Sequence, residues 1–328
     1  MADPRDTPPT PPRWKRTSLT VAKWLLFAVV LGFVARALGR QIGAVRWDTL
    51  TLRPWPLVAA LAAVLVAKAL TFVPYGIMVG HFCRRPLWRR LAPVVWVSQT
   101  GKYLPGKVGA VLGMAWLLGK EGISARVALS SIFIVDGLSV VVGLLTAIPI
   151  TLMDEIRPRL PMAWLWCALA VVGLLVCVHP RVFGTVANAL LKRAGVEPFD
   201  RMPSVLTYVK PVLALLVQYA FLGLGCWLLA LAIAPVGIEA LPAFLCAMVV
   251  ATIGGFVVLF APAGLGVQEG LLLVLLGTVV APETAAIVVV MMRLAQTLCE
   301  AALAGFGFLA LRRPVPKDTG AADGTPGR

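Results

Sequence analysis

The sequence contains few charged residues. Only 14% of its 328 residues are Asp, Glu, Lys or Arg, whereas 59% are hydrophobic and the mean hydropathy is +0.89. Soluble domains carry about a quarter charged residues, so this composition excludes a soluble globular fold. We expect an all-α, polytopic membrane protein, because the apolar residues occur in runs long enough to form membrane-spanning helices.

Residues that usually build catalytic or metal sites are also scarce. The chain has two histidines, both at the edges of apolar segments, and six cysteines without a CxxC pair. It contains no GxSxG, P-loop or HExxH motif, the patterns that place groups for acyl transfer, nucleotide binding or zinc chemistry. The sequence therefore predicts no disulfide framework, no catalytic residues, and no metal or cofactor.

Acidic residues are few compared with basic ones. The chain has 15 Asp and Glu against 30 Lys and Arg, which gives a formal net charge of +15. In a chain this apolar, the excess indicates loops that face an anionic membrane surface rather than a nucleic acid. We therefore expect a multi-pass protein of the bacterial inner membrane.

Six apolar segments have the length that a membrane-spanning helix requires, roughly 20 residues. They cover residues 21–38, 56–80, 127–152, 161–178, 211–234 and 284–311. The alternative for the first is a cleavable signal peptide, because Ala35–Ala37 fits a cleavage site, but further spans follow it. We expect one transmembrane domain, 18–311, between disordered cytoplasmic tails at 1–17 and 312–328.

Two stretches, 91–119 and 241–281, fit this pattern poorly. Each contains two apolar arms separated by glycine and proline, and the arms of the first are too short to cross a membrane alone. Such backbone is tolerated at membrane depth only where protein or a water-filled cavity satisfies its polar groups. We predict two broken, re-entrant helical hairpins, whose turns contain Pro105, Gly106, Gly109, Pro262, Gly264 and Gly266.

The two halves of the chain resemble each other at an offset of 157 residues, at which Pro105 aligns with Pro262. Each half is a hairpin followed by a long span, at residues 91–152 and 241–311. The long spans run in opposite directions in the predicted topology. The sequence therefore indicates an inverted repeat, with its site where the broken helices meet.

Basic residues set the expected orientation, because cytoplasmic loops are enriched in Lys and Arg. Four arginines lie within residues 84–90, so we place this loop and both termini in the cytoplasm. Residues 181–194 carry apolar side chains on one helical face. This pattern fits either a helix in the membrane surface or a loop helix packed on the bundle.

Ionisable residues within the apolar stretches are the candidate functional residues, because a charge at mid-bilayer costs about 2.5–3.5 kcal/mol. With one tyrosine beside them, they are Lys102, Tyr103, Lys107, Asp136, Glu269, Arg293 and Glu300. We expect the lysines to bind an anionic phosphate and the carboxylates to attract a cationic group of the same lipid headgroup. In the alternative, Asp136 and Arg293 form a structural ion pair, and Lys102 extends to the headgroups from a shallow hairpin. Lys68 is expected only to extend toward the membrane surface.

Three segments are similar to motifs of one known family: Gly101–Lys107 (GKYLPGK), the serine-rich span Ser130–Gly143, and Pro262–Glu269 (PAGLGVQE). They resemble the polytopic region of lysylphosphatidylglycerol synthases and their stand-alone relatives, over about residues 20–311. The third motif departs from the family pattern at Ala263, where a glycine is usual.

The resemblance implies a lipid translocase, a flippase or scramblase that moves aminoacylated phosphatidylglycerol or an isoprenoid-linked lipid. No counterpart of the soluble synthase half follows Arg312, so synthase activity is not expected. Two alternatives stay open: a membrane-embedded transferase acting on a lipid phosphate, and an accessory subunit of a separate lipid-modifying enzyme. The expected partners are a membrane phospholipid or isoprenoid lipid, and either a second copy of the chain or a lipid-modifying enzyme.

Overall fold

The computed structural model describes residues 52–84, 87–103, 108–151, 164–165, 168, 171–172, 175, 179–193, 203–258 and 264–312. The structure is 88% helical, and these residues contain no strand, which confirms the predicted all-α fold. The N-terminal tail, the predicted span 21–38 and residues 313–328 lie outside this part of the chain. The predicted span 161–178 lies only partly within it.

Within the described residues, five helical segments are long and apolar enough to span a membrane: Pro54–Cys83, Ala125–Thr146, Val205–Ile233, Ile238–Val257 and Pro282–Leu311. Four of them coincide with predicted spans. Many large apolar side chains on the helices are exposed, among them Leu112, Trp116, Phe133, Leu298 and Phe306. An apolar surface of this kind is unfavourable in water but suits contact with lipid. The chain is therefore a polytopic membrane protein, as predicted.

The first described segment consists of two helices, α2 (Pro54–Ala69) and α3 (Phe72–Cys83). Leu70 and Thr71 separate the two helices, a few residues before Pro74. A proline has no N–H to donate to the carbonyl four residues earlier, here that of Leu70, so it interrupts the helical hydrogen bonds at this point. At its far end α3 is capped by Arg84, whose backbone is left-handed with φ 54°.

The first hairpin follows α3 and leads into a long helix. Its elements are α4 (Trp88–Gln99), η2 (Thr100–Tyr103) and α5 (Val108–Lys120), and the long helix is α6 (Ala125–Thr151). Neither α4, with 12 residues, nor α5, with 13, is long enough to cross a membrane. A glycine is needed at position 101, because a Cβ there would lie 2.4 Å from the backbone of Gly109. The predicted turn residues Pro105 and Gly106 lie outside the described residues.

The second hairpin has a comparable order. It is preceded by η3 (Val205–Tyr208) and α9 (Val209–Ile233), it consists of η4 (Ile238–Ala240), α10 (Leu241–Val257) and α11 (Val267–Leu276), and the long helix α12 (Pro282–Leu311) follows it. Gly264 and Gly266 have φ values of 69° and 84°, which favour glycine, and Pro262 lies outside the described residues. The arms are unequal: η4 with α10 is long enough to span a membrane, whereas α11 has only 10 residues.

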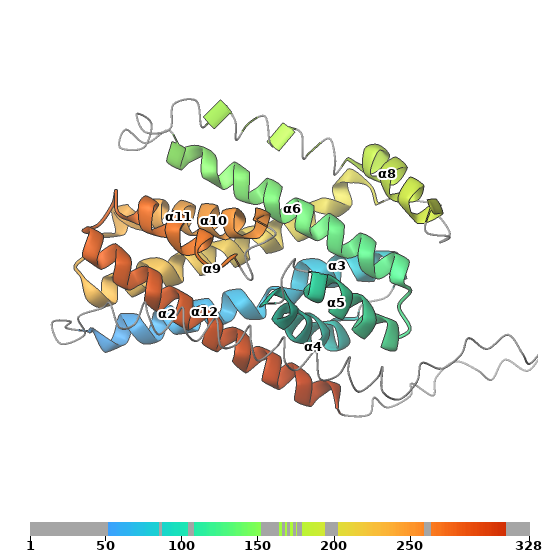
Figure 1. Cartoon of the computed structure of the whole chain (residues 1–328), viewed down its shortest axis with the longest axis horizontal. Helices are drawn as coiled ribbons and strands as arrows, with labels where there is room; N and C mark the ends of the chain where they lie inside the picture. The colour runs from blue at the N-terminus through green and yellow to red at the C-terminus, as the bar shows by residue number, and fades with distance from the viewer. Residues whose placement is uncertain are drawn as a thin grey trace, which may run out of the picture.

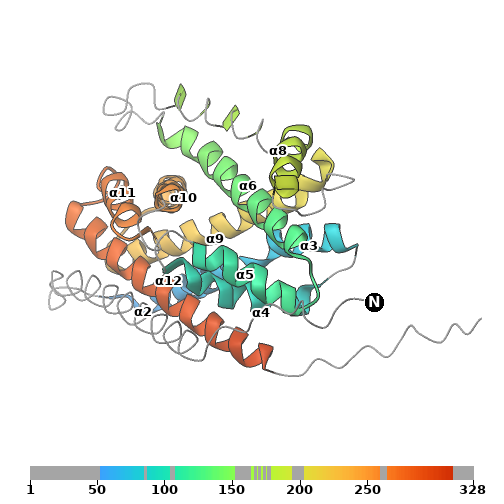
Figure 2. The same cartoon turned by 45° about the vertical axis from the view of Figure 1, so that its right-hand side comes forward.

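The long helices pack across the two halves. α12 packs against α4 of the first hairpin, α6 packs against α10 of the second, and α2 packs along α9. In Figures 1 and 2, α6 and α12 run in opposite directions. The α4–α5 hairpin lies in the right half of Figure 1 and the α10–α11 hairpin in the left half. Each half thus packs against the hairpin of the other, and the inverted repeat stays a prediction.

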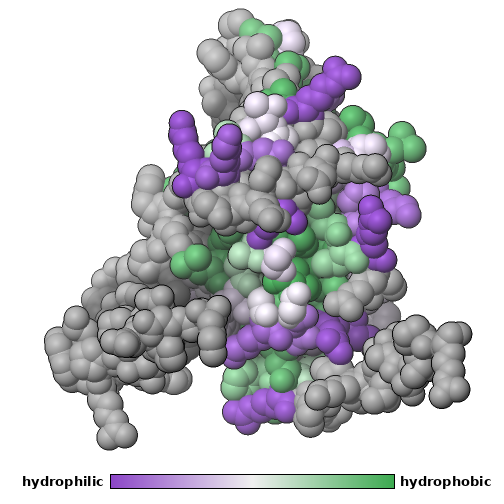
Figure 3. All heavy atoms as spheres, turned by 90° about the vertical axis from the view of Figure 1, so that its right-hand side faces the viewer, coloured by the Kyte–Doolittle hydropathy of each residue, from purple (hydrophilic) through white to green (hydrophobic). Residues whose placement is uncertain are grey.

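Basic residues gather at one end of the bundle, where α3, α5 and α12 end (right side of Figure 1). This basic end also carries α8 (Pro180–Arg193), which confirms the helix expected at 181–194. Figure 3 looks onto this end and shows hydrophilic side chains across it. Its described Lys and Arg residues are Arg84, Arg89, Arg90, Lys120, Arg126, Arg181, Lys192, Arg193, Lys210 and Arg312. At the opposite end, the described part of the chain has Arg53, Glu239 and Glu283.

Candidate functional site

Glu300 of α12 is the centre of a partly buried polar cluster. Its Oε1 lies 2.7 Å from the Nζ of Lys68 on α2 and 2.5 Å from the Nζ of Lys102 in η2. The side chains of Lys68 and Glu300 are only 15% and 13% exposed, and that of Lys102 is 25% exposed. Two ammonium groups therefore share one carboxylate at the tip of the first hairpin.

Neutral hydrogen-bonding groups complete this cluster. The Tyr103 hydroxyl donates to Oε2 of Glu300 at 3.0 Å, and the Lys68 ammonium donates to Oε1 of Gln296 at 3.2 Å. Both oxygens of Glu300 are thus occupied. We call Lys68, Lys102, Tyr103, Gln296 and Glu300 the central cluster. Its charged groups leave one positive charge in excess, because a single carboxylate faces two ammonium groups.

A second ion pair lies on the same helix, seven residues before Glu300. The Nε of Arg293 is 3.2 Å from Oε1 of Glu269 on α11, and its Nη1 is 3.4 Å from Oε1 of Gln268. Oε2 of Glu269 accepts the backbone N–H of Gly266 at 2.7 Å, which caps the start of α11. Seven residues make about two turns, so Arg293 and Glu300 lie on one face of α12. Through this face α12 contacts the first hairpin at Glu300 and the second hairpin at Arg293.

Asp136 lies in a separate group of tyrosines and a serine. Its Oδ1 accepts a hydrogen bond from the Tyr75 hydroxyl at 2.7 Å, and the Tyr219 hydroxyl lies 2.6 Å from the Ser139 hydroxyl. Tyr75 and Tyr219 are 7% and 4% exposed. These four residues, from α3, α6 and α9, form the tyrosine cluster. Gln99, which directly precedes η2 in the chain, lies close to Tyr75 of this cluster.

The structure brings the predicted site residues Lys102 and Tyr103 together with Glu300 in the central cluster. Arg293 lies two turns before Glu300 on the same helix. Glu269 joins them by way of Arg293, whereas Asp136 has Tyr75 as its partner. The alternative interpretation paired Asp136 with Arg293; each instead has the partner described above. Lys107 lies outside the described residues.

One expectation was wrong. Lys68 was expected to extend toward the membrane surface, but its ammonium points inward and pairs with Glu300. The amide of Gln296 was also missed, although its spacing carries a signal. It lies between Arg293 and Glu300 in the sequence, three residues after one and four before the other, so all three share one face of α12.

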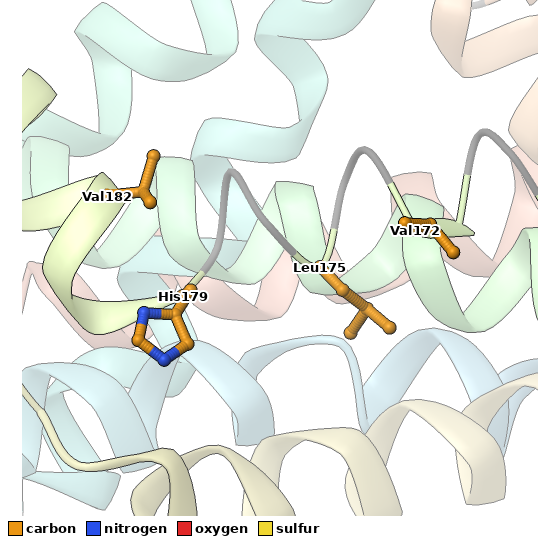
Figure 4. A pocket seen from close by; sticks show the side chains of 4 residues that line it. All are labelled: Val172, Leu175, His179 and Val182. Atoms are coloured by element: carbon orange, nitrogen blue, oxygen red, sulfur yellow. The ribbon is translucent and has the colours of Figure 1, made fainter.

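An apolar pocket lies away from these clusters. Figure 4 shows its lining residues, which are Val172, Leu175, His179 and Val182. Among its described lining residues, His179 alone has a polar side chain. The pocket offers an anion no charged partner comparable to the lysines of the central cluster.

A known protein family matches most of the chain. The family described as "Lysylphosphatidylglycerol synthase TM region" matches residues 13–304, a range that includes every residue of both clusters. A search of curated proteins found no match. The match covers far more than half of the 328 residues. The chain therefore belongs to the lysylphosphatidylglycerol synthase TM region family, and it is a membrane protein associated with lipid modification or transport.

Proposed function

We propose that this protein is a flippase or scramblase for a phosphate-bearing lipid, and that the central cluster binds the lipid phosphate during transfer. The observation that carries the proposal is the sharing of Glu300 by Lys68 and Lys102. Buried charges are usually balanced, because an uncompensated charge in a medium of low dielectric constant is costly. An excess ammonium group in this position favours an anionic ligand.

A lipid headgroup crosses a membrane slowly because its charges must leave water. In the proposed mechanism, the phosphate replaces part of its hydration with the ammonium groups of Lys68 and Lys102. The Tyr103 hydroxyl and the Gln296 amide supply neutral hydrogen bonds, and the acyl chains stay against the exposed apolar side chains of the helices. The barrier falls because the headgroup meets fixed polar groups instead of hydrocarbon.

In this proposal, the tyrosine cluster attracts a cationic group of the lipid headgroup. Asp136 accepts a hydrogen bond from Tyr75, and Gln99, the residue directly before η2, lies close to Tyr75. A cationic group on the lipid, such as the amine of an aminoacyl ester, would be attracted to this carboxylate. We therefore include aminoacylated phosphatidylglycerol among the candidate substrates, beside isoprenoid-linked lipids, whose phosphates require only the lysines.

We also infer that the basic end faces the cytoplasm of a bacterial inner membrane. This inference follows from the positive-inside rule, since the described Lys and Arg residues outside the bundle interior lie almost entirely at that end. In this orientation α12 ends in the cytoplasm. The α4–α5 hairpin then enters from the cytoplasmic side and the α10–α11 hairpin from the opposite side.

The test is lipid transfer by the full chain in vesicles that contain a fluorescent phosphatidylglycerol, measured by dithionite quenching of the outer leaflet. Removing one charge-assisted hydrogen bond costs about 1.5–3 kcal/mol, so Lys102→Gln should slow transfer by roughly 10- to 100-fold. Lys120→Gln is the matched control, because this lysine lies at the end of α5 with its Nζ 3.6 Å from the centroid of the Trp116 ring.

Equal transfer rates for the wild type and Lys102→Gln would refute the assignment of the site. A separate measurement distinguishes transport from lipid chemistry. Transfer needs a bilayer, whereas a transferase works in detergent. Formation of a covalently modified lipid by the detergent-solubilised chain would therefore replace the transport proposal with the enzyme alternative.

A further inference from the structure

A second polar site lies at the basic end, away from the central cluster. It is a cavity of about 530 Å³ between the end of α3, the start of α4 and the segment that leads into α9. We call it the basic cavity. Its lining residues are Gly76, Ile77, Gly80, His81, Arg84, Trp88, Ser204, Leu206, Thr207 and Lys210.

The chemistry of this lining suits an anion. Arg84 and Lys210 supply two positive charges, and His81, Ser204 and Thr207 supply further hydrogen-bonding groups. Within the described part of the chain, neither Arg84 nor Lys210 lies within ion-pair distance of a carboxylate. A guanidinium and an ammonium group side by side are the usual partners of a phosphate in proteins.

The backbone geometry indicates that this site is built into the fold. Arg84 is the one described non-glycine residue with a positive φ, 54°, a conformation that few non-glycine residues adopt. The Trp88 indole packs directly over Gly76, where a Cβ would lie 2.6 Å from the ring, and contacts the Phe72 ring edge to face at 6.2 Å. Because Gly76 has no side chain, the Trp88 indole can pack against it and form one wall of the basic cavity.

The apolar part of the lining indicates an amphiphilic ligand. Ile77, Leu206 and the Trp88 indole border the same cavity as the charged groups, and Leu206 is 81% exposed. Tryptophan is enriched at the level of the lipid headgroups. A soluble anion would gain nothing from these apolar surfaces, whereas a lipid would place its glycerol and upper acyl chain against them.

We propose that the basic cavity binds the phosphate of an anionic phospholipid from the leaflet at the basic end, and that it loads this lipid toward the central cluster. The loading role rests on the proposed function, but the binding does not. α3 leads from the basic cavity to the tyrosine cluster. Gly76 lines the cavity, while the adjacent Tyr75 is buried and donates to Asp136 of the tyrosine cluster.

Binding is measured on the full chain in detergent with short-chain phosphatidylglycerol as the probe. The test variant combines Arg84→Asn with Lys210→Gln, since asparagine tolerates the left-handed backbone at position 84. We expect the affinity to fall by at least tenfold. The control Lys192→Gln with Arg193→Gln removes the same charge from exposed positions of α8 at the same end, and its affinity should stay within twofold of the wild type.

A second readout places the ligand in the cavity. The variant Ser204→Cys is labelled with a maleimide in the presence and absence of lipid, and peptide mass spectrometry separates this position from the native cysteines. Phosphatidylglycerol should slow the labelling, whereas short-chain phosphatidylcholine and inorganic phosphate should not. Protection by inorganic phosphate at the same concentration would overturn the lipid assignment in favour of a free phosphate site.

The outcomes separate this proposal from the proposed function. Unchanged affinity in the Arg84→Asn, Lys210→Gln variant, or unchanged labelling at position 204, would overturn the basic cavity as a lipid site. Binding that is lost in this variant but retained in Lys102→Gln supports the basic cavity even if no variant of the chain transfers lipid. In that case only the loading role fails.

Discussion

Neutralising Glu300 perturbs the central cluster most directly. Glu300→Gln keeps the size of the side chain but removes the only described carboxylate that faces Lys68 and Lys102, which approach it at 2.7 and 2.5 Å. Breaking a buried ion pair by removing one partner costs about 3–5 kcal/mol. Because the three side chains are 13–25% exposed, water screens part of this, and we expect a loss of about 2–4 kcal/mol in unfolding free energy.

A second substitution separates this electrostatic cost from a simple packing defect. Lys68→Met removes one of the two unbalanced ammonium groups, so the Glu300→Gln, Lys68→Met variant should recover at least half of the lost stability. Unfolding is followed by tryptophan fluorescence of the purified chain in one detergent, and the three variants form a double-mutant cycle with the wild type. Additive effects, with no recovery in the double variant, would refute the shared-carboxylate reasoning.

Two further predictions concern the second hairpin. Glu269→Gln should lower thermal stability less than Glu269→Ala, because a Gln oxygen still caps α11 even though the ion pair with Arg293 is lost; equal losses measured by thermal unfolding would contradict the capping role. Gly264→Ala should cost more than about 1 kcal/mol, because φ is 69° and a Cβ would lie 2.9 Å from neighbouring backbone, while the helical control Gly270→Ala, with open space around it, should be neutral or stabilising in the same assay.

The membrane fold could be predicted from the sequence because hydropathy and length decide it. A run of about 20 apolar residues forms a span in almost any context, and the described long helices follow those runs. Length alone does not decide whether the arms of the second hairpin cross the membrane or re-enter it. Its first arm, η4 with α10, is long enough to span, and its packing against α9, α11 and α6 determines its place in the bundle.

Only the part of the candidate site that depends on spacing within one helix could be predicted from the sequence. Glu300 and Arg293 are two turns apart on one helix, so the sequence alone puts them on one face. The role of Lys68 depends instead on tertiary structure. A lysine near a helix end extends to the membrane surface or pairs inward according to what lies beside it, and its partner Glu300 is 232 residues further along the chain. No local pattern contains that information.

The numbers of opposite charges distinguish the two ion-pair sites on α12. Arg293 and Glu269 balance each other, and Glu269 is also needed to cap α11. A phosphate bound there would displace a carboxylate and leave it buried beside a helix that had lost its cap. At Glu300 the second ammonium group binds the phosphate while the first keeps the carboxylate paired, so binding compensates the excess positive charge and leaves no carboxylate unpaired. The central cluster is therefore suited to a ligand that enters and leaves, and the Arg293–Glu269 pair to holding the second hairpin on α12.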